Sequence, residues 1–327
     1  MSHRIPAFRV TLDGQDLTHR IAPRLLDLTL TEQRASEADQ LDLRLHDHDG
    51  RLALPRRGAE LTVALGWKDG GVVDKGVYRV DEVEHSGAPD TVTLRARSAD
   101  LTAALRARRD RSWDATTLGE VVRTLAGNHG LTPRIAPALD RVEVPHLDQT
   151  GESDAALLSR LGKQHDAVAT IKAGRLLFLP IGRGETAAGE PLPAATLTRR
   201  DGDSHRYHVA DREAYSGVRA YWHDRDGANR RSVLAGASGN AKRLRETFAS
   251  EQAAREAAEA EWQRLQRGVG SLSLTLAWGR PDLYPEQPCR VRGFKAEIDA
   301  TDWLIVKVTH SLGGAGFTTA VEMETAL

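Results

Sequence analysis

A short pattern that occurs twice constrains the fold more than any other feature of the sequence. The segment Tyr78–Ser86 recurs as Trp303–Ser311, with an aromatic residue first, aliphatic residues at the third and sixth positions, and His-Ser at the end. The offset is 225 residues at both ends of the pattern. A Gly-containing loop and another strand pattern follow each copy, which is typical of a β-hairpin. These matches alone leave duplication and chance both open, because β-rich sequences share such patterns.

Apolar residues at every second position indicate β-strands in the first and last parts of the chain. The pattern runs from Ala7 to Ala99 and resumes after about residue 270. Gly and Pro separate the runs, which predicts an antiparallel sheet or barrel. The clearest alternating sets are Leu26, Leu28, Leu30; Leu41, Leu43, Leu45; Leu61, Val63, Leu65; Val92, Leu94, Ala96; and Leu272, Leu274, Leu276.

Charge and cysteine content exclude several classes of protein. The 327-residue chain is long enough for two or three packed domains. It carries 45 basic and 46 acidic residues, so its net charge favours neither nucleic acid nor an anionic membrane. The single cysteine, Cys289, rules out an intramolecular disulfide framework and suits a reducing compartment. Residues 1–8 lack the apolar run of a signal peptide, and no stretch approaches the ~20 apolar residues of a membrane helix.

The centre of the chain has helical patterns. The stretch Pro145–Leu179 predicts a turn, one amphipathic helix with Ser153 as its N-cap, and then a hairpin. Upstream, Thr117 and Glu120 have capping-box spacing and begin another helix. We interpret the basic run Arg106–Arg111 as a solvated connection, because no aromatic residue interleaves it.

A linker and one more helix follow the centre. The segment Gly182–Pro193 is rich in Gly and Pro, which indicates a linker or exposed loop. Strand patterns resume around Tyr215–Trp222, and a Ser-Gly-rich segment comes next. The alanine-rich stretch Glu251–Arg267 predicts a helix with Ser250 as N-cap and Gly268 at its end.

Around the central helix the chain resembles a known family. The motifs are HLDQ at His146–Gln149, ESD at Glu152–Asp154 and LLSRL at Leu157–Leu161. They resemble the late control gene D proteins of contractile-tailed phages, and the N-terminal part of the valine–glycine repeat spike proteins of type VI secretion. Looser matches in the same order extend over nearly the whole chain: Leu41–Gly50, Pro55–Gly66, Arg111–Trp113, the alanine-rich helix and Gly316–Thr319.

The resemblance implies a structural role in a tail baseplate. Such a hub is a homotrimer that joins a sixfold tail tube to a threefold spike, in a virion tail, a prophage or a phage-tail-like particle assembled in the bacterial host cytoplasm. The implied partners are the trimeric spike protein, the tail tube or tube-initiator protein, and the tape-measure protein. Because the sequence ends at Leu327 without an oligonucleotide-binding domain or β-helical needle, we expect the spike to be a separate polypeptide. The alternatives are a tail-associated cell-wall hydrolase and a hub or effector adaptor of a type VI-like secretion system.

The motifs that resemble chemical sites have simpler explanations. The run His46–Asp49 (HDHD) has residues that bind transition metals, but Asp-x-Asp-Gly turn chemistry explains both it and His223–Gly227. The segment Gly236–Asn240 imitates a nucleophile elbow but ends in Asn and lacks the strand-to-helix change. No helix follows Gly313–Gly316 to receive a phosphate. We therefore predict no catalytic, cofactor-binding or metal-binding residues, and no enzyme.

These observations predict an α+β, mainly β fold. We expect two related antiparallel β-barrel-like tube domains at 1–105 and 181–327, an inserted small α/β module at 106–180, and one further helix at about 251–267. A trimer can match a sixfold tube only if each subunit contributes two similar domains. Tyr78 and Trp303 should then occupy equivalent strands of two separate barrels, and Leu61 should correspond to Cys289. Non-equivalent strands, or one continuous sheet, would indicate a chance repeat.

Overall fold

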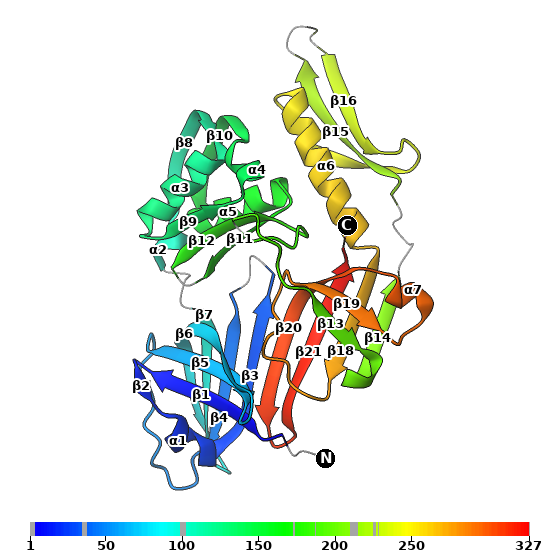
Figure 1. Cartoon of the computed structure of the whole chain (residues 1–327). Coiled ribbons are helices and arrows are strands. Elements are labelled where there is room, and N and C mark those ends of the chain that lie inside the picture. Colours follow the sequence, from blue (N-terminus) through cyan, green and yellow to red (C-terminus); the bar gives the residue numbers. More distant parts are fainter. Residues whose placement is uncertain are drawn as a thin grey trace.

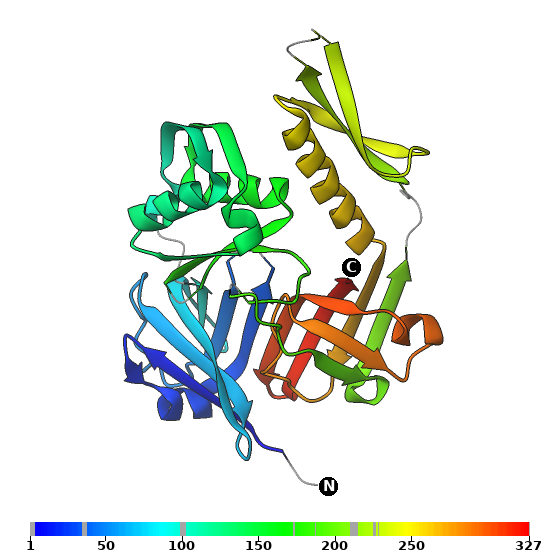
Figure 2. The ribbon, with the colours of Figure 1, turned by 45° about the horizontal axis from the view of Figure 1, so that its top comes forward.

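Two β units, an α/β module and a projecting arm make up the protein (Figure 1). The computed structural model describes residues 4–34, 38–98, 103–172, 174–186, 188–209, 215–224, 227 and 229–326. The two β units lie side by side at the bottom of Figure 1, with the module above the first unit and the arm above the second. Figure 2 shows the same arrangement after a tilt. The module and the arm are in contact at the end of α6 (Glu251–Arg267), where Arg267 Nη1 donates to Asp166 Oδ2 at 2.6 Å.

The first β unit comes from the N-terminal part of the chain. Its Leu-rich strands alternate as predicted, and Leu41, Leu43 and Leu45 are all buried in its core. Burial of each such side chain contributes about 1.5–3 kcal/mol. The elements are β1 (Pro6–Leu12), β2 (Gln15–Asp16), α1 (Thr18–Ile21), the 3-10 turn η1 (Ala22–Arg24), β3 (Leu25–Gln33), β4 (Gln40–His46), β5 (Glu60–Trp67), β6 (Gly71–Ser86) and β7 (Thr91–Ser98).

The second β unit comes mainly from the C-terminal part and has a core of its own. Leu272, Leu274 and Leu276 point into that core together with Trp303. The elements are β13 (Ala195–Thr198), the 3-10 turn η2 (Arg199–Asp201), β14 (Gly202–Val209), β18 (Gly270–Leu276), β19 (Pro288–Arg292), α7 (Ala296–Asp299), β20 (Trp303–Gly313) and β21 (Gly316–Thr325).

The two β units have the same strand order. Across the sheet the first unit reads β1-β5-β6-β7-β4-β3, and the second reads β13-β19-β20-β21-β18-β14. In both units the chain visits these positions in the same sequence. Tyr78 in β6 and Trp303 in β20 therefore occupy equivalent strands, as do Leu61 in β5 and Cys289 in β19. The predicted equivalence is confirmed.

The β-bulges of the two units coincide as well. The ladder between β6 and β7 shifts register between Val80 and Glu82, and the ladder between β20 and β21 shifts between Ile305 and Lys307. Both pairs of positions keep the 225-residue offset. Because a bulge bends a strand at one specific position, coincident bulges favour duplication over chance.

The expectation of two separate sheets is wrong. Strand β20 pairs with β3, from Lys307–Gly313 against Asp27–Gln33, and this ladder joins the two units into one sheet. The continuity does not indicate a chance repeat, because order and bulges still match. The second unit is also not wholly antiparallel, since β13 pairs with β19 in parallel, whereas β1 and β5 are antiparallel.

The module inserted between the units packs helices against a small sheet. As predicted, the side chain of Thr117 caps α3 and that of Ser153 caps α5, by accepting hydrogen bonds from the N–H groups of Glu120 and Ala156. The elements are α2 (Ala103–Arg106), β8 (Arg108–Thr117), α3 (Leu118–Asn128), β9 (Thr132–Ile135), α4 (Pro137–Asp140), β10 (Glu143–Ser153), α5 (Asp154–Gln164), β11 (Ala167–Lys172) and β12 (Arg175–Pro180).

Two predictions for the module are wrong. The stretch before α5 is not a turn but strand β10, and the basic run Arg106–Arg111 is not a connection, because most of it belongs to strand β8. The two strands form an antiparallel ribbon with a register shift between Gln149 and Glu152. The predicted hairpin after α5 is confirmed as β11 and β12, although Ala173 in its turn lies outside the described residues.

The arm is a three-stranded sheet covered by one long helix. Its elements are β15 (Gly217–Asp224), β16 (Asn229–Gly236), β17 (Ala241–Phe248) and α6 (Glu251–Arg267). Ser250 caps α6 by accepting from the N–H of Ala253, and Gly268 follows its last turn, both as predicted. The Ser-Gly-rich segment after β15 contributes to β16 and β17, the two edge strands of this sheet. No helix among the described residues is both long and apolar enough to span a membrane.

Candidate functional site

The run β14-β18-β21-β20-β3-β4-β7-β6 passes from one β unit into the other at the joint between β20 and β3, and the sheet continues beyond β6 through β5, β1 and β2. The two units meet at this joint through main-chain hydrogen bonds rather than side chains alone. Trp67 of the first unit also donates its indole N–H to the carbonyl of Gly279 in the second, at 2.9 Å. The ring of Phe317 lies 5.3 Å from that of Trp67. The joint therefore holds the units in one fixed relation.

A buried charge cluster crosses this joint. The Lys75 Nζ, on β6, donates to Glu32 Oε2 on β3 at 2.7 Å and to the carbonyl of Leu283 at 3.1 Å. The side chains of Lys75 and Glu32 are only 4% and 8% exposed. The His310 Nε2, on β20, lies 3.4 Å from the same carboxylate, and its Nδ1 is 2.9 Å from Thr319 Oγ1. The ion pair of Lys75 and Glu32 thus lies within the first unit, and the second unit contacts it through the His310 ring and the Leu283 carbonyl.

The protonation states follow from burial and charge. Burial raises the pKa of the Glu32 carboxyl, but the contact with His310 and the charge of Lys75 outweigh it and lower the pKa to about 2. Burial lowers the pKa of His310 below its usual value. The imidazole is therefore neutral at neutral pH, and the charge pair at the joint is Lys75 with Glu32.

The family-like motifs of the module form a buried polar network. The Asp154 carboxylate is fully buried at the start of α5 and accepts from Gln149 Nε2 at 2.8 Å and Arg111 Nη2 at 2.9 Å. Its other oxygen lies 2.7 Å from His129 Nε2. Burial raises the pKa of Asp154, but the hydrogen bonds from Gln149 and His129 outweigh it and hold that pKa below its usual value. Asp154 of the ESD motif thus connects the start of α5 to the end of α3 and to the β8–β10 ribbon through hydrogen bonds.

A Ser-His-Asp group lies on the outer face of that ribbon. The Ser112 hydroxyl donates to Asp148 Oδ1 at 2.6 Å, while His146 Nδ1 lies 2.6 Å from Asp114 and its Nε2 lies 3.0 Å from Asp148 Oδ2. Both carboxylates raise the pKa of His146, that of Asp114 most. Both ring nitrogens already face carboxylates, so neither accepts the serine proton as a catalytic base must. Sequence reasoning missed this group because its members alternate along two strands.

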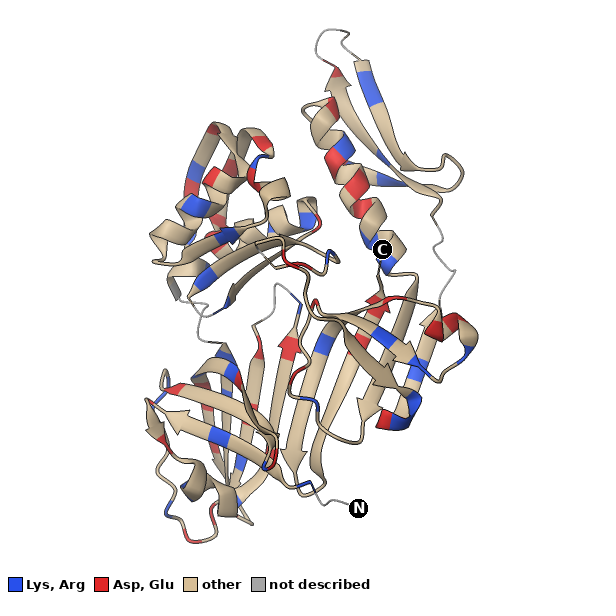
Figure 3. Cartoon of the chain, in the orientation of Figure 1, with Lys and Arg blue, Asp and Glu red and all other residues tan. Residues whose placement is uncertain are grey.

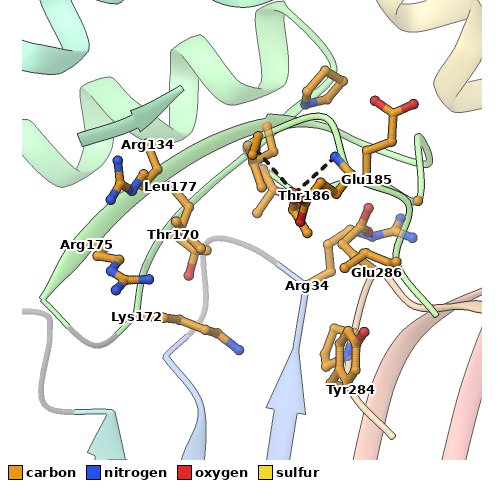
Figure 4. Close-up of a pocket in the computed structure, with 18 of the residues that line it drawn as sticks. Arg34, Arg134, Thr170, Lys172, Arg175, Leu177, Glu185, Thr186, Tyr284 and Glu286 are labelled. Atoms are coloured by element: carbon orange, nitrogen blue, oxygen red, sulfur yellow. Dashed lines mark hydrogen bonds and ion pairs between the residues drawn. The ribbon is translucent and has the colours of Figure 1, made fainter. Parts of the chain in front are cut away.

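A cavity of 730 Å³ lies between the module and the joint (Figure 4). Arg134, Lys172 and Arg175 line its module side, and the Arg34–Glu286 ion pair lines the opposite side. Lys172 pairs with Asp39 Oδ2 at 3.2 Å. Within the described residues the cavity holds no group of three metal-ligating side chains. Its loop wall belongs to the Gly-Pro-rich segment 182–193, which we predicted to be a linker or exposed loop, and most of the described residues of that segment are exposed.

The sequence motifs that imitate chemical sites are turns, as far as the structure describes them. The His46 and His48 rings lie 5.2 Å apart, and His46 Nδ1 accepts the N–H of His48 at 3.0 Å, which closes a local turn after β4. The neighbouring Asp47 accepts from the N–H of Leu52 at 3.0 Å. In the second motif, Arg225 and Asp226 lie outside the described residues. The segment 236–240 links strands β16 and β17, without a strand-to-helix change.

Solved structures with this architecture are tail proteins and a secretion protein. The 43 kDa tail protein of prophage MuSo2 from Shewanella oneidensis aligns with a TM-score of 0.70 at 16% identity over 98% of both chains. A tail protein from Neisseria meningitidis aligns at 0.72 and 13% identity, over 98% of this chain and 96% of that one. A type VI secretion component of E. coli aligns at 0.57 and 16% identity, over 92% and 73%. The chain thus has the fold of phage-type tail proteins.

Sequence comparison gives the family. The profile of the phage tail baseplate hub (GPD) family matches residues 32–315. The probable baseplate hub protein of Escherichia phage 186 is 45% identical over 98% of this chain and 93% of that protein. Its counterpart in Escherichia phage P2 is 43% identical over 98% and 94%. The chain belongs to the phage tail baseplate hub family, which confirms the predicted resemblance and assigns it to the tail baseplate.

Proposed function

We propose that the protein acts as a homotrimeric hub that joins a sixfold tail tube to a threefold spike. The observation that carries this proposal is the repeated β unit: strand order, the 225-residue offset and the bulges agree between the two halves. Three copies provide six equivalent units around one axis, which is the number a sixfold tube needs. Closed cyclic assembly of this kind uses a heterologous interface on each subunit.

We propose the division into 1–105, 106–180 and 181–327 as the working domains. The largely separate cores of the two β units and of the module support it, with Leu312 and Phe317 of the second unit packing into the core of the first. The module and the arm project from the same side of the joined sheet (Figure 1), so both lie outside a ring built from the β units. In this arrangement they are the surfaces available to other tail components.

We propose the spike protein and the tail tube or tube-initiator protein as partners, with the tape-measure protein as a further one, during assembly in a host cytoplasm. Acidic and basic residues are interspersed over all parts of the chain (Figure 3), which fits contacts with proteins rather than with nucleic acid. A further fold relative is a chain of a Francisella PdpA–VgrG complex, which aligns over 99% of this chain and 58% of that one at 8% identity and a TM-score of 0.60.

We also propose that the protein works without catalysis. The support is that the imidazoles of His146 and His129 are already matched with carboxylates inside the module. If the protein were instead a cell-wall hydrolase, the purified chain would cleave peptidoglycan. Turbidity clearing of cell-wall suspensions, lost on His146→Ala, would contradict the proposal.

The trimer is tested by light scattering and electron microscopy of the purified chain. We expect a concentration-dependent trimer and a ring with a central hole. An obligate contact of this type commonly buries on the order of 2,000 Å² or more, so the trimer should form at high protein concentration or on addition of the spike. A strictly monomeric protein that also fails to bind the spike and tube proteins encoded beside it would end the hub proposal.

A further inference from the structure

The cavity between the module and the joint has one wall with two chemically different ends. This wall is the sheet of β9, β12 and β11, on the face turned away from the core of the module. Leu176 and Phe178 of β12 are buried in that core, so Leu177 and Leu179, which alternate with them, point to the other face and line the cavity. Arg175, at the start of the same strand, lines it as well. The wall is thus cationic at one end and apolar at the other.

Three basic side chains make up the cationic end. Lys172 on β11 stands directly opposite Arg175 on β12, and like charges that face each other across two strands repel. Arg134 on β9 stands opposite Leu177, which places its Cα roughly 8 Å from that of Arg175. Lys172 has a counter-ion in Asp39, at 3.2 Å. Arg134 and Arg175 are exposed and have no ion pair among the described residues, so this end of the wall lacks an anion.

The loop that closes the cavity is held by its own main chain. The N–H of Thr186 donates to the carbonyl of Glu190 at 2.7 Å, and the N–H of Leu192 donates to the carbonyl of Gly184 at 2.6 Å. Figure 4 shows Thr186 across the cavity from the basic side chains. The volume of 730 Å³ is typical of a ligand site. Because sheet and loop are both formed without a ligand, binding there orders little of the protein.

We propose that this cavity binds the C-terminal end of a partner polypeptide that finishes in an apolar residue. Its terminal carboxylate lies between Arg134 and Arg175, and its last side chain packs on Leu177 and Leu179. Guanidinium groups bind carboxylates through paired, charge-assisted hydrogen bonds, and capture of a chain's terminal carboxylate is a recurring mode of peptide recognition. The site goes beyond the hub role and does not depend on the trimer, because all of its residues belong to one copy.

Other anions match the walls less well. A nucleic acid brings a series of phosphates, and these meet the carboxylates of Glu185 and Glu190, which line the same cavity. A fatty acid sets hydrocarbon against this polar loop, and polar groups buried without hydrogen bonds cost free energy. A peptide has one carboxylate for the cationic end, an apolar side chain for the apolar end, and main-chain N–H groups for the carboxylates of the loop.

Fluorescence anisotropy with a labelled peptide tests the site. The probe is fluorescein-Gly-Ala-Val-Leu-Leu with a free terminal carboxylate, and the matched probe is the same peptide as its amide. We expect saturable binding of the carboxylate form, at least tenfold tighter than the amide form. Arg134→Ala and Arg175→Ala should each weaken binding of the carboxylate form at least fivefold and leave the amide form unchanged. The control is Arg141→Ala, an exposed arginine of the module that does not line the cavity, and it should change neither affinity.

The outcomes separate this site from other interpretations. The comparison of the two probes uses the unaltered protein, so it stands even where a variant folds poorly. Equal affinity for the two probes, or no saturable binding of the carboxylate form up to millimolar concentration, overturns the proposal. Decanoate or duplex DNA that displaces the peptide and binds more tightly than it does also overturns it, in favour of a fatty acid or a nucleic acid. The trimer is measured separately by light scattering, and either proposal can fail without the other.

Discussion

Replacement of Lys75 by Met should loosen the joint between the β units. The substitution keeps an unbranched, largely apolar side chain but removes the ammonium group that donates to the buried Glu32 carboxylate at 2.7 Å. The pKa of Glu32 falls from 4.5 to about 2 in the folded protein. At about 1.4 kcal/mol per unit this corresponds to about 3 kcal/mol of stabilisation shared by Lys75 and His310. Loss of one partner of a buried pair typically costs 3–5 kcal/mol, so we expect Lys75→Met to lower the free energy of unfolding by about 3 kcal/mol.

The assay is urea unfolding followed by tryptophan fluorescence at pH 7. Trp67 reports on the joint directly, because its ring packs 5.5 Å from Trp278 and 5.3 Å from Phe317. The matched control is the double variant Lys75→Met, Glu32→Gln, which removes both charges. Because a neutral pair leaves no uncompensated charge, it should recover most of the lost stability.

The pH dependence gives an independent check on the same pair. Since the pKa of Glu32 is lowered on folding, its contribution is complete above pH 4.5 and is lost as the pH falls through about 2. Glu32→Gln should therefore flatten the acid limb of the stability curve in this window. Wild-type stability for Lys75→Met, or a double variant less stable than the single one, would refute the reasoning.

Three further predictions concern other parts of the chain. Ser153→Ala should cost about 1 kcal/mol by removing the α5 cap, whereas Ser159→Ala on the exposed face of the same helix should be nearly neutral in thermal unfolding. Arg267→Met should lower the free energy of unfolding by about 3 kcal/mol in urea unfolding. The reason is that it leaves the buried Asp166 carboxylate, which Arg267 Nη1 contacts at 2.6 Å, without its charged partner. Replacing both His46 and His48 by Ala should change the free energy of unfolding by less than ~0.5 kcal/mol. Stoichiometric zinc or iron bound to chelator-washed wild-type protein, and absent from that variant, would contradict the interpretation of this segment as a turn.

Local patterns were enough to predict much of the fold. Alternation placed Leu41 and Leu272 in strands of two different cores, and side-chain chemistry located the helix caps Ser153 and Ser250. Each of these features depends on residues within a few positions, where periodicity and hydrogen-bonding groups act directly. The repeat could be noticed from sequence, but its significance came from bulges that only pairing partners define.

Features that depend on distant partners escaped prediction. The β8–β10 ribbon reads as basic and polar because both of its faces hold charged side chains, so it lacks the alternation that marks a half-buried strand. The ion pair of Lys75 with Glu32 joins residues 43 positions apart, and nothing near either residue signals burial. Arg-rich β16 and β17 were missed for the same reason as the ribbon.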